Sequence, residues 1–125
     1  SQSWAAWFDD DSRRLWVAEP KKAIIGLVGV GPVRDESFDA DTGEIDALYV
    51  LPEHWRQSWG SVLLRPAMKN LASRFERIVL WALSGNERAR AFYRDRGFRT
   101  PGETKYHTFR GATLELEQFR HDLEG

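Results

Sequence analysis

A turn in the middle of the chain has the residue types and spacing that suit a phosphate group. An apolar run ends at Pro52, residues 54–60 form a predicted turn, and apolar residues then recur at helical spacing from Trp59 onward. The N-terminus of a helix presents unpaired N–H groups and a partial positive charge, which suit a pyrophosphate. Because many α/β domains have such a turn and bind nothing there, the turn alone favours a purely structural role.

A second segment, LWALSGNERARAFYRDRGF at residues 80–98, places a tyrosine beside a predicted sheet. Residues 78–83 are almost continuously apolar, which is typical of a central strand buried on both faces. Asn86 can cap the helix that follows, and Gly97 can end it. Tyr93 lies within this helix and is expected to point back toward the sheet.

Together these two segments resemble the GNAT superfamily of acyl-CoA-dependent N-acyltransferases. In that family an asparagine opens the second helix, FY lies within it and GF ends it. The segment EIDALYVLPEHWRQSWGSVLLRPAM at residues 44–68 resembles the central motif, usually written R/Q-x-x-G-x-G/A. The likeness runs from about residue 15 to residue 119, and two motifs in this order are more specific than either one. It implies an α/β (α+β) GNAT fold, in which helices flank a central, mostly antiparallel mixed sheet.

The resemblance also implies that acetyl-CoA is the acyl donor and shows where it would lie. The backbone amides of the turn would hold the pyrophosphate, at Arg56, Gln57, Ser58, Trp59, Gly60 and Ser61. The strand residues Leu48, Tyr49 and Val50 match those that pair with the pantetheine arm and offer a backbone N–H to the thioester oxygen. Asn86 completes the predicted cofactor-binding set.

The implied reaction is direct attack of a primary amine on the thioester in a ternary complex. Tyr93 matches the family's tyrosine that protonates the departing thiolate. A lysine-like amine has a pKa near ~10.4, so a base must accept its proton before attack. Glu44 matches a catalytic glutamate of the histone acetyltransferase branch, with Asp46 on the same face as the reserve candidate. In the alternative interpretation Glu44 is a solvated edge-strand carboxylate, because many relatives use water chains instead.

The chain departs from the family pattern at two places. The preferred glycines of the phosphate turn are replaced by Arg56 and Ser58, and only Gly60 remains, although the backbone must approach the phosphates closely there. Relatives also carry a first strand and two helices before the point where this sequence starts. We therefore expect an N-terminally short domain, either because the protein is naturally short or because the sequence lacks its N-terminal part. A naturally short chain would expose a sheet edge that favours a homodimer.

The rest of the pattern predicts the elements that position these residues. Hydrophobic periodicity and turn residues predict one helix at residues 59–74 and another at residues 86–97. Residues 4–8 are predicted to be the end of a third helix. They also predict strands at 15–19 and 23–30, which form a hairpin, and at 44–51, 78–83 and 113–119. Residues 98–99 are expected to begin a further strand, and residues 101–111 to form a loop.

Composition narrows the class of protein. The 125 residues, 42% of them hydrophobic, predict one GNAT acetyltransferase domain over residues 1–125. A formal net charge of -1 argues against nucleic acid and anionic membranes as partners, and no apolar run is long enough to span a bilayer. Cysteine is absent and the three histidines show no metal spacing, so we expect no metal and a cytoplasmic location.

Charge is nevertheless uneven along the chain. Six carboxylates lie between residues 35 and 46, whereas five arginines lie between residues 88 and 99. One interpretation is that the carboxylates favour a cationic amine and the arginines favour the phosphates of CoA. The other is that both are ordinary solvated surfaces.

The favoured function is an acyl-CoA-dependent N-acyltransferase acting on a small-molecule or protein amine. The altered phosphate turn keeps open an alternative, a non-catalytic acyl-CoA-binding GNAT-like module. An RNA-binding domain that uses the arginine-rich helix ranks third, because the chain has neither a basic total charge nor assignable stacking aromatics.

Overall fold

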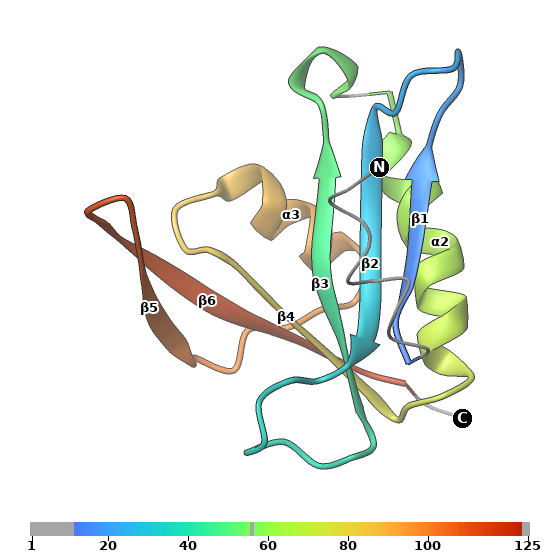
Figure 1. Ribbon diagram of the computed structural model, residues 1–125. Helices are drawn as coiled ribbons and strands as arrows, with labels where there is room; N and C mark the ends of the chain where they lie inside the picture. The colour runs from blue at the N-terminus through green and yellow to red at the C-terminus, as the bar shows by residue number, and fades with distance from the viewer. Residues whose placement is uncertain (1–11, 56, 124–125) are drawn as a thin grey trace.

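The computed structural model of the protein describes residues 12–55 and 57–123. Within them a six-stranded sheet runs in the order β1-β2-β3-β4-β6-β5 and carries two α-helices (Figure 1). The elements are β1 (Arg14–Ala18), β2 (Gly26–Pro32), β3 (Thr42–Val50), the 3-10 turn η2 (Pro52–His54), α2 (Trp59–Ala72), β4 (Arg77–Leu83), α3 (Glu87–Asp95), β5 (Thr104–Phe109) and β6 (Ala112–Asp122). The predicted α+β architecture is confirmed.

The sheet is antiparallel except between β3 and β4, its two middle strands. These two run parallel and pair over only three residues each, the last pair being Glu44 and Val79. Beyond this pair the strands diverge, as Figure 1 shows. The divergence leaves one edge of β3 without a neighbouring strand and opens the sheet on the side of the C-terminal end of β3.

The two helices anchor the two halves of the divided sheet. The apolar face of α2 packs against β1, β2 and β3, and Leu64 and Leu71 are buried there with Val28. Helical spacing of these residues explains why 59–72 folds as a helix on the sheet. From α3, Tyr93 packs against Phe119 of β6 with their ring centroids 5.5 Å apart.

Several predicted elements are confirmed with shifted ends. The hairpin of β1 and β2 is antiparallel and regular. In the pairing of β2 with β3, the register shifts between Gly29 and Val30, which indicates a bulge. The side chain of Asn86 caps α3 by accepting a hydrogen bond from the N–H of Ala89 at 3.1 Å. Gly97 follows α3 at a φ of 93°, which favours glycine over other residues. The helix predicted at 4–8 lies outside the described residues.

The prediction for residues 98–111 is wrong. Residues 98–99 supply only an isolated bridge, between Arg99 and Arg120. The expected loop contains β5, an edge strand that pairs with β6 along its whole length. Its side chains are mostly exposed, Tyr106 by 67%, so no apolar period marks the strand. In the part of the chain described, no helix is long and apolar enough to cross a membrane.

Candidate active site

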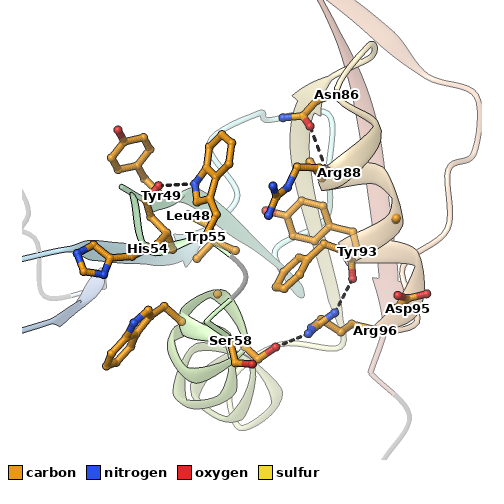
Figure 2. A pocket seen from close by; sticks show the side chains of 17 residues that line it. Leu48, Tyr49, His54, Trp55, Ser58, Asn86, Arg88, Tyr93, Asp95 and Arg96 are labelled. Atoms are coloured by element: carbon orange, nitrogen blue, oxygen red, sulfur yellow. Dashed lines mark hydrogen bonds between the residues drawn. The ribbon is translucent and has the colours of Figure 1, made fainter. Parts of the chain in front are cut away.

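A cavity of about 700 Å³ lies between the end of β3, the start of α2 and one face of α3 (Figure 2). The cavity lies where β3 and β4 no longer pair. The predicted site residues that line it are Leu48, Tyr49, Val50, Ser58, Trp59, Gly60, Ser61, Asn86 and Tyr93. Gln57 is exposed and lies outside the lining, and Arg56 lies outside the described residues.

The start of α2 presents backbone donors to this cavity. The N–H of Val62 makes the first helical bond, to the carbonyl of Ser58 at 3.0 Å. The N–H groups of Trp59, Gly60 and Ser61 therefore precede the hydrogen-bond ladder of the helix. The side chain of Ser58 makes no capping bond to them. These donors and the helix dipole suit an anion.

Ser58 shows why the family motif prefers glycine at this point. Its φ of 67° and ψ of 13° place it in the left-handed region. This conformation costs a residue with a Cβ about 1–2 kcal/mol, and glycine far less. A glycine at this position would avoid that cost.

Gly60 is required for a different reason, the close approach of α2 and α3. A Cβ at this position would lie 3.2 Å and 3.3 Å from two ring atoms of Phe92 on α3. Such contacts are tighter than ordinary van der Waals packing. Gly60 thus permits this close approach, since a side chain at this position would require the Phe92 ring or the start of α2 to shift.

Tyr93 is held in the cavity wall by an aromatic cluster. Its ring packs against Phe92, Phe98 and Phe119 at centroid distances of 5.3, 5.6 and 5.5 Å. The residue is only 7% exposed, and burial raises the pKa of its hydroxyl to about 12. Tyr93 therefore stays protonated at neutral pH, as a proton donor must.

Glu44 occupies a different position from Tyr93. It forms the last β3–β4 pair, at the point where the strands diverge, and it is not among the residues that line the cavity. Burial and then the charge of Asp46 raise the pKa of its carboxyl, which accepts a hydrogen bond from the Arg34 N–H at 3.2 Å. Asp46 is paired with Arg13, and with Arg34 at 3.5 Å.

Trp55, Arg88 and Arg96 also line the cavity, although they were not among the predicted site residues. The guanidinium carbon of Arg88 lies 4.5 Å from the centre of the Trp55 ring, and the Trp55 indole N–H donates to the carbonyl of Val50 at 2.8 Å. The cluster of arginines at 88–99 was the available signal. It could not show which of them face the cavity, because that depends on contacts across the fold.

The described residues include no cluster of three or more histidine, aspartate or glutamate side chains that could hold a metal ion. The polar groups of the cavity include the backbone donors of α2 and the side chains of Arg88, Arg96, Tyr93, Asn86, His54 and Asp95. This set fits a phosphorylated ligand with a reactive group near Tyr93.

Comparison with known proteins agrees with this geometry. Residues 1–98 match the model of the acetyltransferase (GNAT) family. A protein of Mycobacterium tuberculosis named as a probable N-acetyltransferase is 33% identical over 90 residues, covering 72% of this chain and 49% of its own length. N-acetyltransferase family 8 member 3 of Rattus norvegicus is 30% identical, covering 74% of this chain and 41% of its own length. The chain thus spans about half the length of these relatives.

Solved structures show the same fold. Ribosomal-protein-alanine N-acetyltransferase from Brucella melitensis superposes with a TM-score of 0.81 at 22% identity, covering 98% of this chain and 76% of its own. A GNAT family acetyltransferase from Elizabethkingia anophelis with acetyl-CoA bound superposes with a TM-score of 0.71 at 17% identity, covering 98% and 83%. Because the family model covers most of its length, the chain belongs to the GNAT acetyltransferase family.

Proposed function

We propose that this protein transfers an acetyl group from acetyl-CoA to a primary amine within a ternary complex. The observation that carries the proposal is the position of a buried, protonated tyrosine in the same cavity as the N–H groups at the start of α2. One part of this cavity suits a diphosphate and another suits a leaving thiolate. The acetyl-CoA-bound relative from Elizabethkingia anophelis supports the choice of donor.

The open edge of β3 supports a place for the pantetheine arm. Beyond Glu44, β3 pairs with β2 along one edge but forms no pair with β4 in the described strands. Backbone groups near Leu48 and Tyr49 on that open edge can pair with the amides of the arm. A strand N–H there would stabilise the oxyanion, a contribution worth about 3–4 kcal/mol in other enzymes.

The proposed reaction balances with two proton transfers. The amine nitrogen bonds to the thioester carbonyl carbon, and the carbonyl oxygen becomes an oxyanion. The amine proton goes to Glu44. Because Glu44 lies where the strands diverge and not in the cavity wall, water carries this proton. The C–S bond then breaks, and Tyr93 protonates the departing thiolate. Glu44 releases its proton to solvent and Tyr93 takes one up, which returns both groups to their starting states. The products are an amide and CoA.

The test is binding of CoA by calorimetry together with thiol release from acetyl-CoA over a panel of amines. Micromolar CoA binding and amine-dependent release are the expected results. CoA binding without amine-dependent release would favour a non-catalytic acyl-CoA-binding module, an alternative that the strained Ser58 keeps open. Absence of binding by CoA and acetyl-CoA alike would remove both.

We propose a small-molecule or protein amine as the acceptor. The same activity is proposed for any longer protein that contains this chain. The single domain over residues 1–125, the cytoplasmic location and the homodimer also stay predictions. Sedimentation of the purified chain would test the homodimer directly.

A further inference from the structure

The five arginines between residues 88 and 99 differ in what they contact. Arg90 and Arg99 form ion pairs with carboxylates. Arg94 is exposed and lies outside the cavity lining. Arg88 and Arg96 line the cavity, and neither forms an ion pair with a carboxylate of residues 12–55 or 57–123. Of the five arginines, these two therefore bring positive charge to the cavity, whose lining also includes the carboxylate of Asp95.

Of these two, Arg96 is held in the more fixed position. It follows α3, and Figure 2 shows its side chain reaching toward the start of α2. One guanidinium nitrogen donates to the carbonyl of Phe92 at 3.0 Å, and the other donates to the hydroxyl of Ser61. The guanidinium carbon also lies 3.7 Å from the centre of the Phe92 ring. All of these partners are neutral, so they orient the charge without cancelling it.

This charge lies beside the N-terminus of a helix. Ser61 is the third residue of α2, so the guanidinium and the first N–H groups of α2 are neighbours. A helix N-terminus favours anions and disfavours cations. Two positively charged features therefore meet at one wall of the cavity. Asp95 also lines the cavity, but no ion pair joins it to Arg96 in the described residues. An arginine in this position can form paired, charge-assisted bonds to phosphate oxygens.

We propose that Arg96 binds the diphosphate of the acyl donor and so selects phosphate-carrying thioesters over those that end at the pantetheine arm. The inference rests on the proposed function, because it takes acetyl-CoA as the donor. Arg96 adds a fixed charge at a turn where Ser58 and Arg56 stand in place of glycines. The backbone N–H groups of α2 carry only partial charges, whereas the guanidinium of Arg96 carries a full positive charge.

The test compares two donors in the variant Arg96→Gln, acetyl-CoA and acetyl-pantetheine. A hydrogen bond to a charged group is strong enough that its loss weakens binding about tenfold or more. We therefore expect the Kd for CoA to rise, and kcat/KM for acetyl-CoA to fall, by at least about tenfold. The kcat/KM for acetyl-pantetheine should stay unchanged, because that donor has no diphosphate.

The matched control is Arg94→Gln, two residues away on the exposed side of the same segment, which should leave both donors unaffected. Salt gives a second readout. The affinity of the native protein for CoA should fall more steeply with ionic strength than that of Arg96→Gln, since one charge contact is lost. The variant Arg96→Lys keeps the charge but not the planar fork, and it should recover part of the affinity.

Three outcomes would overturn the inference while leaving the proposed function intact. One is a Kd of Arg96→Gln for CoA within about twofold of that of the native protein, because loss of a charged contact predicts a rise of about tenfold or more. Another is an equal loss with both donors, which would indicate a structural role. If Arg96→Gln does not fold, Arg96→Lys carries the test, and native affinity in that variant would contradict the need for a fork. Failure of the native protein to bind CoA would instead defeat the proposed function.

Discussion

Tyr93 shows how the surroundings of one side chain set its proposed chemistry. Replacing it by phenylalanine removes the hydroxyl and keeps the packing against Phe92, Phe98 and Phe119. We expect Tyr93→Phe to lower kcat by about 10²-fold, the low end for a general acid, because a thiolate is already a fair leaving group. The KM for acetyl-CoA should change little. Steady-state thiol release measures both constants, and an unchanged kcat would exclude the acid role.

Glu44 predicts a specific pH dependence. Burial and the charge of Asp46 raise the pKa of Glu44, so it accepts a proton only above that raised value. The kcat/KM profile should therefore fall on the acid side as Glu44 becomes protonated. In Glu44→Gln we expect activity at neutral pH to fall by about 10²-fold or more, because the amine then loses its base.

The remaining activity of Glu44→Gln should increase toward high pH, as the amine loses its own proton near pH ~10. Asp46→Asn is the informative partner variant. Removing this negative charge lowers the pKa of Glu44, so the acid limb of the profile should move to lower pH. A profile identical in Glu44→Gln and the native protein would mean that water alone accepts the proton.

At this same scale, sequence reasoning was strongest where function depends on local spacing. Asn86 could be assigned as a helix cap because the cap and its helix are adjacent in the chain. The contact of Arg96 with Ser61 spans 35 residues, and that of Trp55 with Arg88 spans a strand and a helix. Periodicity in the sequence does not indicate such long-range contacts. The positions of these side chains at the cavity could therefore be identified only from the structure.

At the scale of elements, segments with a visible apolar period were predicted, and the edge strand β5, which has none, was not. The strand β4 and the helix α2 bury apolar faces, and their periods are visible in the sequence. The edge strand β5 buries little, because its stability comes from backbone pairing with β6 rather than from an apolar face. Without a buried face the strand shows no apolar alternation, which is why a loop was expected there, although its threonine, tyrosine and phenylalanine residues are types enriched in strands.

The packing of α2 against α3 carries the next prediction. In Gly60→Val the added side chain would meet the ring of Phe92, since even a Cβ would lie 3.2 Å from it. Either the Phe92 ring or the start of α2 must then shift, and we expect the start of α2 to move and displace its N–H groups. We expect CoA affinity, measured by calorimetry, to fall about tenfold or more, as for the loss of one charged hydrogen bond.

Gly85→Ala is the control for this variant, because a Cβ at Gly85 meets nothing within 4 Å. It should bind CoA as the native protein does. If Gly60→Val kept native affinity, the distance between the two helices would not control the phosphate-binding turn.

At the scale of the whole molecule, one divided sheet explains both the cavity and the cohesion of the domain. The strands β3 and β4 pair only where they begin, and the helices cover the parts that separate. The rings of Tyr93, Phe98 and Phe119 join α3 to the second half of the sheet. The residue proposed as the acid is thus also a core residue, so its ionisation is linked to unfolding of the whole domain.

Alkaline unfolding tests this linkage. The pKa of Tyr93 is about 12 in the folded protein, against about 10 for an unperturbed tyrosine in the unfolded chain. Below pH 10 both states hold the proton and its contribution to stability is complete. Between pH 10 and 12 only the unfolded state releases the proton, so stability falls as pH rises. The loss should reach about 1.4 kcal/mol by pH 11.

Tyr93→Phe isolates this contribution, because phenylalanine does not titrate and the other groups of the protein remain. Urea unfolding followed by tryptophan fluorescence gives the free energy of unfolding of both proteins at pH 8 and pH 11. The difference between native protein and variant should shift in favour of the variant by about 1.4 kcal/mol over this interval. A difference that stays constant would mean that Tyr93 is not buried as the aromatic cluster requires, and the cavity wall beside it would need another description.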